Sequence, residues 1–301
     1  MKTWKKVVSA VCVSALTICV LGGCGENTKT KQTIHIATKP MTEQLILGEM
    51  LGMLIEDNLD VDVEITKGVG GGTANIQTGL MNGEFDLYPE YTGTSWLYVL
   101  KKTEVPDSET LFAELQKEYE EQYDLKWEGL YGFNNTFRLL VRQEVVDEYN
   151  LKTTSDLAKV ADKLTFGAGY DYFEREDGYD ALCNAYQMKF GKIVEMDSGL
   201  KYTALNEKEV DVITVYTTDA QISVAGASVM EDDLHFFEDY FCGTVIRAEA
   251  LEANPGLEEV LLMMEGLISD EDMVEMNYAV EVDKRDEAEV AEEFLQKKGL
   301  K

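Results

Sequence analysis

One short pattern occurs twice in this chain and constrains its fold more than any other feature. The stretch from Glu84 to Thr94 reads as a short apolar strand that ends and leads into a helix, and the stretch from Glu209 to Asp219 repeats it. A chance match is one explanation. The other is a pair of similar α/β lobes, in which ligands bind beyond the carboxyl ends of the strands. The positions that match are Glu84 and Glu209, Asp86 and Asp211, Tyr91 and Tyr216, and Thr92 and Thr217.

Strand-like and helix-like segments alternate along the rest of the chain. Alternation of this kind predicts an α/β fold with parallel-rich sheets and right-handed crossovers. Two further segments, 126–141 and 236–245, are predicted to cross between the lobes, which makes the first lobe discontinuous. The predicted strands are 33–37, 61–65, 84–88, 164–167, 193–196 and 210–215, and the predicted helices are 42–58, 110–123, 155–161, 179–187, 202–206, 256–268, 270–278 and 288–298.

The domain boundaries follow from the two crossings. A chain of 301 residues is long enough for two domains of ordinary size. We predict that residues 33–135 and 243–301 form the first lobe and that residues 136–242 form the second. On this interpretation Tyr91 and Tyr216 lie on opposite walls of one cleft.

The amino terminus has the features of a targeting segment. Three lysines precede an uncharged apolar run from Val7 to Val20, and small residues lead to Cys24. This arrangement resembles the bacterial lipobox, which implies a signal peptide over 1–23, lipidation of Cys24, a tether over 24–32 and a place on the outer face of the cell membrane. An ordinary signal peptide with an incidental cysteine is the alternative.

Composition excludes several classes of function. The net charge of −30 would repel phosphate backbones, so nucleic acid is not expected as a partner. The chain has two histidines and no zinc-type spacing, and it shows no nucleophile–base pair, so we expect no metal, no cofactor, no catalytic residue and no enzyme activity. Cys183 and Cys242 are the cysteines left after the leader, and the sequence does not decide whether they are paired.

A glycine-rich loop, Gly68–Thr73, precedes a predicted short helix. Backbone N–H groups of such a loop can bind an anion at the helix start. The loop lacks the Lys-Ser/Thr ending of a phosphate-binding loop, so a carboxylate is a better candidate than a nucleotide. A simple tight turn explains the glycines equally well.

Aromatic residues recur at predicted strand ends and crossovers. The chain has 15 tyrosines, and Tyr91, Phe137, Tyr216 and Tyr240 lie at such positions. Aromatic faces that converge on one point attract a quaternary ammonium ion by cation–π interaction. Ordinary core packing is the competing explanation for these rings.

Five motifs resemble substrate-binding proteins of ABC importers for glycine betaine, carnitine and choline. The resemblance covers the mature chain in order, and it implies a two-lobed type II periplasmic-binding-protein clamp that works with an ABC permease and ATPase. It also implies a four-aromatic cage for a trimethylammonium head, which falls on Tyr91, Phe137, Tyr216 and Tyr240, although tyrosine is usual at position 137. The motifs are Met41–Gln44, Met81–Asp86, Pro89–Thr94, Tyr131–Thr136 and Tyr216–Asp219.

The pair Phe137-Arg138 departs from the osmoprotectant pattern. With Gly72 and Thr73 it is more similar to the branch that binds ergothioneine, a betaine with an imidazole-thione ring. The resemblance implies that Arg138 binds the ligand carboxylate, because guanidinium forms forked hydrogen bonds with carboxylates. Alternatively, Arg138 points away from the cleft, since neighbouring strand residues face opposite sides. An osmoprotectant ligand, or a surface lipoprotein without a transport role, remains an alternative.

Overall fold

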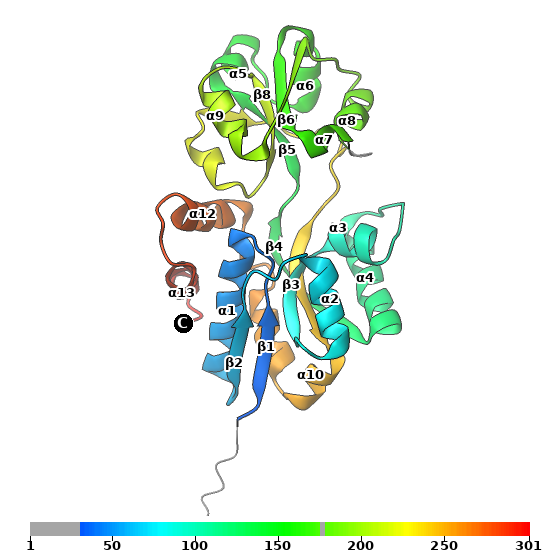
Figure 1. Cartoon of the computed structure of the whole chain (residues 1–301), viewed down its shortest axis with the longest axis vertical. Helices are drawn as coiled ribbons and strands as arrows, with labels where there is room; N and C mark the ends of the chain where they lie inside the picture. Colours follow the sequence, from blue (N-terminus) through cyan, green and yellow to red (C-terminus); the bar gives the residue numbers. More distant parts are fainter. Residues whose placement is uncertain (1–30, 175–177) are drawn as a thin grey trace, which may run out of the picture. The chain divides into compact units, whose positions relative to one another are not determined.

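Two α/β lobes make up the part of the chain that the structure describes. The structure is a computed structural model that describes residues 31–174 and 178–301, and Gln32–Lys301 form one compact unit. Each lobe is built around its own five-stranded sheet. Figure 1 labels β1 to β4 in the first lobe and β5, β6 and β8 in the second. The predicted signal peptide, most of the tether and Cys24 lie outside the described residues.

The sheet of the first lobe has the strand order β2-β1-β3-β10-β4. Strand β1 is parallel to β2 and β3, whereas β10 runs antiparallel to both β3 and β4. The strand β10 comes from late in the sequence, so this sheet contains strands from two separate parts of the chain. The bounds are β1 Thr33–Ala37, β2 Asp62–Thr66, β3 Leu87–Tyr91, β4 Leu125–Asn134 and β10 Phe241–Arg247.

The sheet of the second lobe repeats this plan in the order β7-β6-β8-β5-β9. Again two parallel pairings, β6 with β7 and with β8, are followed by two antiparallel ones, β5 with β8 and with β9. Both sheets are therefore mixed rather than parallel-rich, because the strands that continue from a connection between the lobes run against their neighbours. The bounds are β5 Phe137–Arg142, β6 Thr165–Gly169, β7 Lys192–Met196, β8 Val212–Tyr216 and β9 Ala227–Val229.

The repeated sequence pattern falls on equivalent strands. Its first copy includes β3 and its second includes β8, and each of these is the central strand of its sheet. Tyr91 and Tyr216 are the last residues of these two strands. The two copies of the sequence pattern thus occupy equivalent positions in the two sheets.

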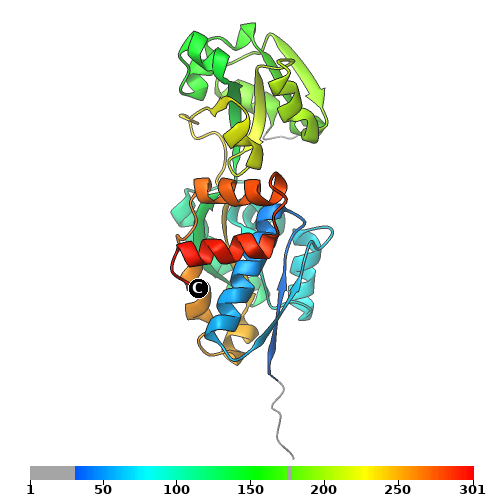
Figure 2. The ribbon, with the colours of Figure 1, turned by 90° about the vertical axis from the view of Figure 1, so that its left-hand side faces the viewer.

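Helices cover both faces of the first sheet. On one face α1 packs with α11, α12 and α13, and Figure 2 brings α1, α12 and α13 to the front. On the other face α2 and α4 pack against Tyr88 and Trp127. The predicted helix 256–268 is shorter in the structure and gives way to a 3₁₀ turn at Leu262–Met264. The bounds are α1 Thr42–Asn58, α2 Thr73–Asn82, α3 Thr92–Thr94, α4 Ser108–Tyr123, α10 Ala248–Ala253, α11 Leu257–Leu261, α12 Asp270–Glu281 and α13 Glu287–Lys297.

The second sheet is also covered on both sides. A core around Phe166 lies under α5 to α8, and a smaller core around Ile213 lies under α9. The short elements α5, α7, α10 and β9 were not predicted, because each is too short to show a clear hydrophobic period. The bounds are α5 Gln143–Tyr149, α6 Thr154–Ala158, α7 Tyr170–Glu174, α8 Tyr179–Ala185 and α9 Lys201–Asn206.

Two connections join the sheets. Asn135 and Thr136 link β4 to β5, and residues 230–240 lead from β9 back to β10. Phe241 and Cys242 already pair with strands of the first sheet, whereas the second part of the first lobe was predicted to begin at residue 243. The exact lobe boundaries remain a prediction.

Candidate functional site

A cavity of about 190 Å³ lies where the predicted aromatic residues meet, and we call it the aromatic cavity. Its walls come from the carboxyl ends of β3 and β8, from the segment after β1 and from both connections between the sheets. All four rings predicted to form a cage belong to it. The lining residues are Lys39, Met41, Tyr91, Thr94, Asn135, Thr136, Phe137, Tyr216 and Tyr240.

Phe137 and Tyr216 form one wall. They are directly opposite each other in the antiparallel pair β5–β8, with ring centroids 4.6 Å apart and planes inclined by 30°. Tyr216 is 39% exposed, which is unusual for a ring at the end of a buried strand. Both rings line the aromatic cavity, and Phe137 also packs against the core of the second lobe.

Tyr240 lies against the backbone of Gly93. A Cβ atom at Gly93 would come within 2.7 Å of Cε1 of Tyr240, so a larger residue would push this ring away. The backbone N–H of Tyr240 donates to Oδ1 of Asn134 at 2.8 Å, and this hydrogen bond holds the backbone of Tyr240 in place. Glycine at position 93 thus sets how closely Tyr240 approaches the helix after β3.

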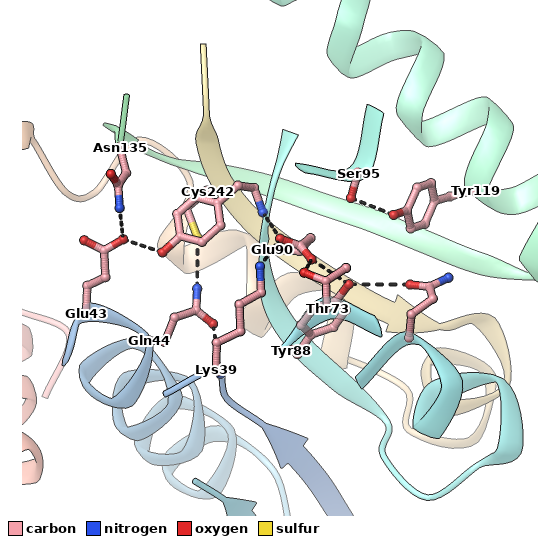
Figure 3. Close-up of polar contacts among 12 residues, drawn as sticks. Lys39, Glu43, Gln44, Thr73, Tyr88, Glu90, Ser95, Tyr119, Asn135 and Cys242 are labelled. Carbon is pink, nitrogen blue, oxygen red and sulfur yellow. Dashed lines mark hydrogen bonds and ion pairs between the residues drawn. The ribbon is translucent and has the colours of Figure 1, made fainter. Parts of the chain in front are cut away.

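Lys39 and Glu90 form a buried ion pair, which Figure 3 shows, and Tyr91 lies beside it. Glu90 is fully buried, and its carboxylate also accepts hydrogen bonds from Tyr91 N–H (2.6 Å), Thr73 Oγ1 (2.7 Å) and Tyr88 hydroxyl (3.0 Å). Nζ of Lys39 is 4.8 Å from the centroid of the Tyr91 ring. Because Glu90 offsets the lysine charge, the aromatic cavity has no uncompensated cation among its lining residues.

The hydroxyl of Tyr91 donates to a second buried carboxylate, that of Glu43. Nδ2 of Asn135 donates to the same carboxylate at 2.6 Å, as Figure 3 shows, and Nδ2 of Asn277 approaches it at 3.3 Å. Burial raises the pKa of Glu43, although these hydrogen bonds oppose the shift. Glu43 therefore joins a ring of the aromatic cavity to the β4–β5 connection and to α12.

Three predicted ligand-binding residues, Gly72, Thr73 and Arg138, do not line the aromatic cavity. Gly72 N–H closes a turn onto the carbonyl of Val69 at 3.1 Å, and the Thr73 hydroxyl holds Glu90. Both groups are therefore used inside the protein, which agrees with the tight-turn interpretation of the glycine-rich loop. Thr73 supports the site by holding the partner of Lys39.

Arg138 faces away from the aromatic cavity. Its Nη1 donates to the carbonyl of Phe137 at 2.8 Å, and its guanidinium carbon is 5.8 Å from the centroid of Phe237. It lines a different cavity, of about 400 Å³, together with Asp232 and Asp239. Since Phe137 and Arg138 are adjacent on β5, their side chains face opposite sides of the sheet. The geometry therefore gives no support to a carboxylate contact by Arg138 beside Phe137.

Sequence reasoning missed several lining residues. Met41, Thr94, Asn135 and Thr136 lie in motifs that carried the family resemblance, but their roles were not assigned. Lys39 could have been found, because it follows β1 at a carboxyl strand end, where ligands bind in α/β sheets.

Other kinds of site find no support in the described residues. Within 31–174 and 178–301 no group of His, Cys, Asp and Glu could hold a metal ion. Cys183 and Cys242 are free rather than paired. A search of the same residues for a helix of membrane-spanning length and hydropathy found none.

Two α/β lobes joined by two connections define a periplasmic-binding-protein fold, the class to which solute-binding components of importers belong. The chain belongs to the family described as the substrate binding domain of ABC-type glycine betaine transport systems, which it matches over residues 32–297. This confirms the class and the fold expected from the sequence motifs.

Named relatives differ in the solute that their names give. The chain is 41% identical to the ergothioneine transport permease/ergothioneine binding protein EgtU of Helicobacter pylori (strain G27), over 91% of this chain and 49% of that protein. It thus spans about half the length of this relative. It is 36% identical to the carnitine transport binding protein OpuCC of Listeria monocytogenes, over 94% of this chain and 91% of the relative.

Solved structures agree with the fold. A crystal structure of a glycine betaine/carnitine/choline ABC transporter protein is 31% identical, has a TM-score of 0.83, and covers 89% of this chain and 99% of that one. Apo YehZ from Escherichia coli has a TM-score of 0.78 at 22% identity over 89% of this chain and 99% of its own. The second likeness shows the fold alone.

Proposed function

We propose that this chain captures a trimethylammonium solute of the betaine type in the aromatic cavity and delivers it to the permease and ATPase of an ABC importer. The observation that carries the proposal is the meeting of Tyr91, Phe137, Tyr216 and Tyr240 around one cavity. A quaternary ammonium ion has no N–H donors, so aromatic faces recognise it better than carboxylates alone. Each ring contributes about 0.5–2 kcal/mol by cation–π attraction.

The site is better suited to the cationic head than to the carboxylate of a betaine. Lys39 is the charged residue among those that line the aromatic cavity, and Glu90 already neutralises it. Tyr216 is partly exposed, so the aromatic cavity is open beside this ring and the rest of the solute can extend there. The four rings therefore recognise the trimethylammonium head that all betaines share. The surface next to the aromatic cavity then determines which betaine binds.

Ergothioneine is the proposed solute. The 41% identity to a protein named for ergothioneine transport and binding supports this choice. A relative named for carnitine at 36% identity supports the alternative, an osmoprotectant such as carnitine, glycine betaine or choline. The two alternatives differ in size, because ergothioneine carries an imidazole-thione ring that the small osmoprotectants lack.

Titration calorimetry of the chain with ergothioneine, carnitine, glycine betaine and choline tests both parts of the proposal. We expect ergothioneine to bind most tightly and choline least. Tightest binding of carnitine, glycine betaine or choline would favour the osmoprotectant alternative. If none of the four raises the melting temperature or gives binding heat, a surface lipoprotein without a transport role is the better interpretation.

The amino-terminal segment gives the proposed location. Basic, apolar and small residues precede Cys24 in the order that a lipoprotein signal requires. We propose that Cys24 carries lipid and holds the protein on the extracytoplasmic face of the cell membrane, where solute-binding proteins of importers act. Two acyl chains suffice for stable anchoring, whereas one does not.

A further inference from the structure

A second cavity of about 320 Å³ adjoins the aromatic cavity. The two share Met41, Asn135 and Tyr216 as lining residues, so a solute with its head among the rings can extend from one into the other. We call the second one the acidic cavity, because Glu43 and Asp219 line it.

Two buried acceptor atoms without donors belong to residues that line the acidic cavity. Asn135 is 8% exposed and Asn277 is 4% exposed, and Oδ1 of each has no hydrogen-bond partner among the described residues. Both residues line the acidic cavity, and they come from distant parts of the chain, the β4–β5 connection and α12. Buried polar atoms of this kind are rare and call for a specific explanation.

The orientation of these amides is fixed by their other hydrogen bonds. Nδ2 of Asn277 donates to the carbonyl oxygen of Thr218 at 2.9 Å, and a carbonyl oxygen can only accept. Nδ2 of Asn135 donates to Oε1 of Glu43 at 2.6 Å. Turning either amide over would therefore lose an existing hydrogen bond, and the two Oδ1 atoms remain the groups that need donors.

The carboxyl groups that line the acidic cavity determine which kind of solute group can donate hydrogen bonds to the two Oδ1 atoms. Glu43 is buried and Asp219 is partly buried, and desolvation raises the pKa of both carboxyl groups. Oδ2 of Asp219 already accepts from the backbone N–H of Tyr216 and the hydroxyl of Tyr202, each at 3.1 Å. Glu281 is a third carboxyl group among the lining residues, which include no lysine or arginine. A carboxylate on the solute would therefore find no cationic partner here, whereas an uncharged ring that carries N–H groups can donate to the two Oδ1 atoms.

We propose that the acidic cavity is a subsite for an N–H-bearing heteroaromatic ring of the solute, and that Asn135 and Asn277 accept its hydrogen bonds. The inference rests on the proposed function, because it places the trimethylammonium head in the aromatic cavity. It names a solute class: betaines with a donor-bearing ring. Ergothioneine belongs to this class, whereas glycine betaine and choline do not.

Three betaines with the same head test the subsite by calorimetry on the unchanged chain. Glycine betaine has no ring, Nα-trimethylphenylalanine has a ring without N–H, and Nα-trimethylhistidine has a ring with N–H. We expect trimethylhistidine to bind about tenfold or more tighter than trimethylphenylalanine, because a site built for hydrogen bonds discriminates strongly against a ligand that lacks them. Equal affinities of these two ring betaines would overturn the subsite.

Substitutions then assign the effect to the two amides. Asn277→Leu and Asn135→Leu should each bring the affinity ratio of the two ring betaines to within about twofold. Asn58→Leu is the matched control, because Asn58 is an exposed asparagine at the end of α1 that lines neither cavity, and it should keep the parent ratio. A ratio that survives both asparagine substitutions contradicts the assignment, and if one variant does not fold, the other and the ligand comparison decide.

The same titrations separate the subsite from the cage. If both ring betaines bind equally and both lose affinity in Tyr240→Ala, the proposed function stands and the subsite is wrong. If no betaine binds, or if the affinity for betaines is unchanged in Tyr240→Ala, the proposed function itself is wrong.

Discussion

Asp86 and Asp211 hold the same position in the two sheets. Each precedes the central strand of its sheet, and each uses Oδ2 to accept a backbone N–H from the neighbouring parallel strand, that of His35 for Asp86 and that of Thr165 for Asp211, both at 2.8 Å. Each also forms an ion pair with an arginine at the end of the antiparallel neighbour, Arg247 or Arg142. One carboxylate thus ties three adjacent strands together in each lobe.

This relationship explains why the repeated pattern spans both an acidic residue and a tyrosine. The aspartate fixes the start of the central strand, and the tyrosine five residues later lies at its end, where the aromatic cavity forms. Because the strand lengths are equal, fixing the starts also fixes where Tyr91 and Tyr216 are placed.

Removing one of these carboxylates should destabilise the fold. Asp211→Ala loses the hydrogen bond from Thr165 and leaves Arg142 without its partly buried partner, so we expect a loss of about 1–3 kcal/mol in the free energy of unfolding. Urea denaturation measures it. Glu209→Ala, at an exposed position two residues earlier, should change the value by less than about 0.5 kcal/mol. Equal effects of the two variants would contradict the role of Asp211.

The positions of the aromatic residues were predictable because strand ends leave a mark in the sequence. Tyr91, Phe137, Tyr216 and Tyr240 were expected at strand ends or crossovers, and all four line the aromatic cavity. The family resemblance named the same residues. Long helices such as α1 were also predictable, since their buried residues recur at helical spacing over many turns.

Side-chain direction and long-range hydrogen bonds were not predictable from the sequence. Whether Arg138 or Phe137 faces the aromatic cavity depends on the register of β5 with β8, and a shift by one residue exchanges the two faces. The link between Glu43 and Asn277 joins residues far apart in the chain, and no local pattern marks it. The sequence could suggest the cage but could not show the acidic cavity beside it.

Loss of a single ring should weaken binding of a trimethylammonium solute. Tyr240→Ala and Phe137→Ala should each cost about 1–2 kcal/mol, or roughly 5- to 30-fold in affinity, because each removes one cation–π contact. Calorimetry with the tightest of the four betaines measures it. Tyr98→Ala serves as the control, because Tyr98 is exposed and does not line the aromatic cavity. Unchanged affinity in both ring variants, with intact folding, would refute the cage.

Substitution of Arg138 distinguishes the sequence expectation from the geometry. The sequence resemblance implies that Arg138→Ala weakens every betaine but not choline. The structure turns this side chain toward Phe237 and away from the aromatic cavity, so we expect betaine affinity to change by less than about threefold. A selective loss for carboxylate-bearing solutes would show that Arg138 reaches the solute after all.

Membrane attachment should depend on Cys24. In Cys24→Ser the acyl acceptor is lost, so the protein should move from the membrane fraction to the medium, because stable anchoring requires the acyl chains. Cell fractionation with immunoblotting measures the distribution, and Cys183→Ser, which changes a free cysteine of the second lobe, is the control. Retention of Cys24→Ser in the membrane fraction would contradict the lipoprotein assignment.

Stability should depend on pH through the buried carboxyl group of Glu43. Burial raises its pKa in the folded chain above the value in the unfolded chain, which is about 4.3 for a free glutamate. The folded state therefore binds a proton more tightly than the unfolded state does. The stability that this proton contributes is fully present below the unfolded pKa and is lost as the pH rises through the folded pKa.

Glu43→Gln isolates this contribution, because glutamine does not titrate. As the pH rises from 4 toward neutrality, the unfolding free energy of the parent should fall relative to that of the variant, by about 1.4 kcal/mol for each unit that separates the folded and unfolded pKa values. Asp219, whose pKa burial also raises, is present in both proteins and cancels from the difference. Urea denaturation at several pH values measures it. A difference that stays constant with pH, or that moves in the parent's favour, would mean that Glu43 is held as a carboxylate by Tyr91, Asn135 and Asn277 rather than as a neutral acid.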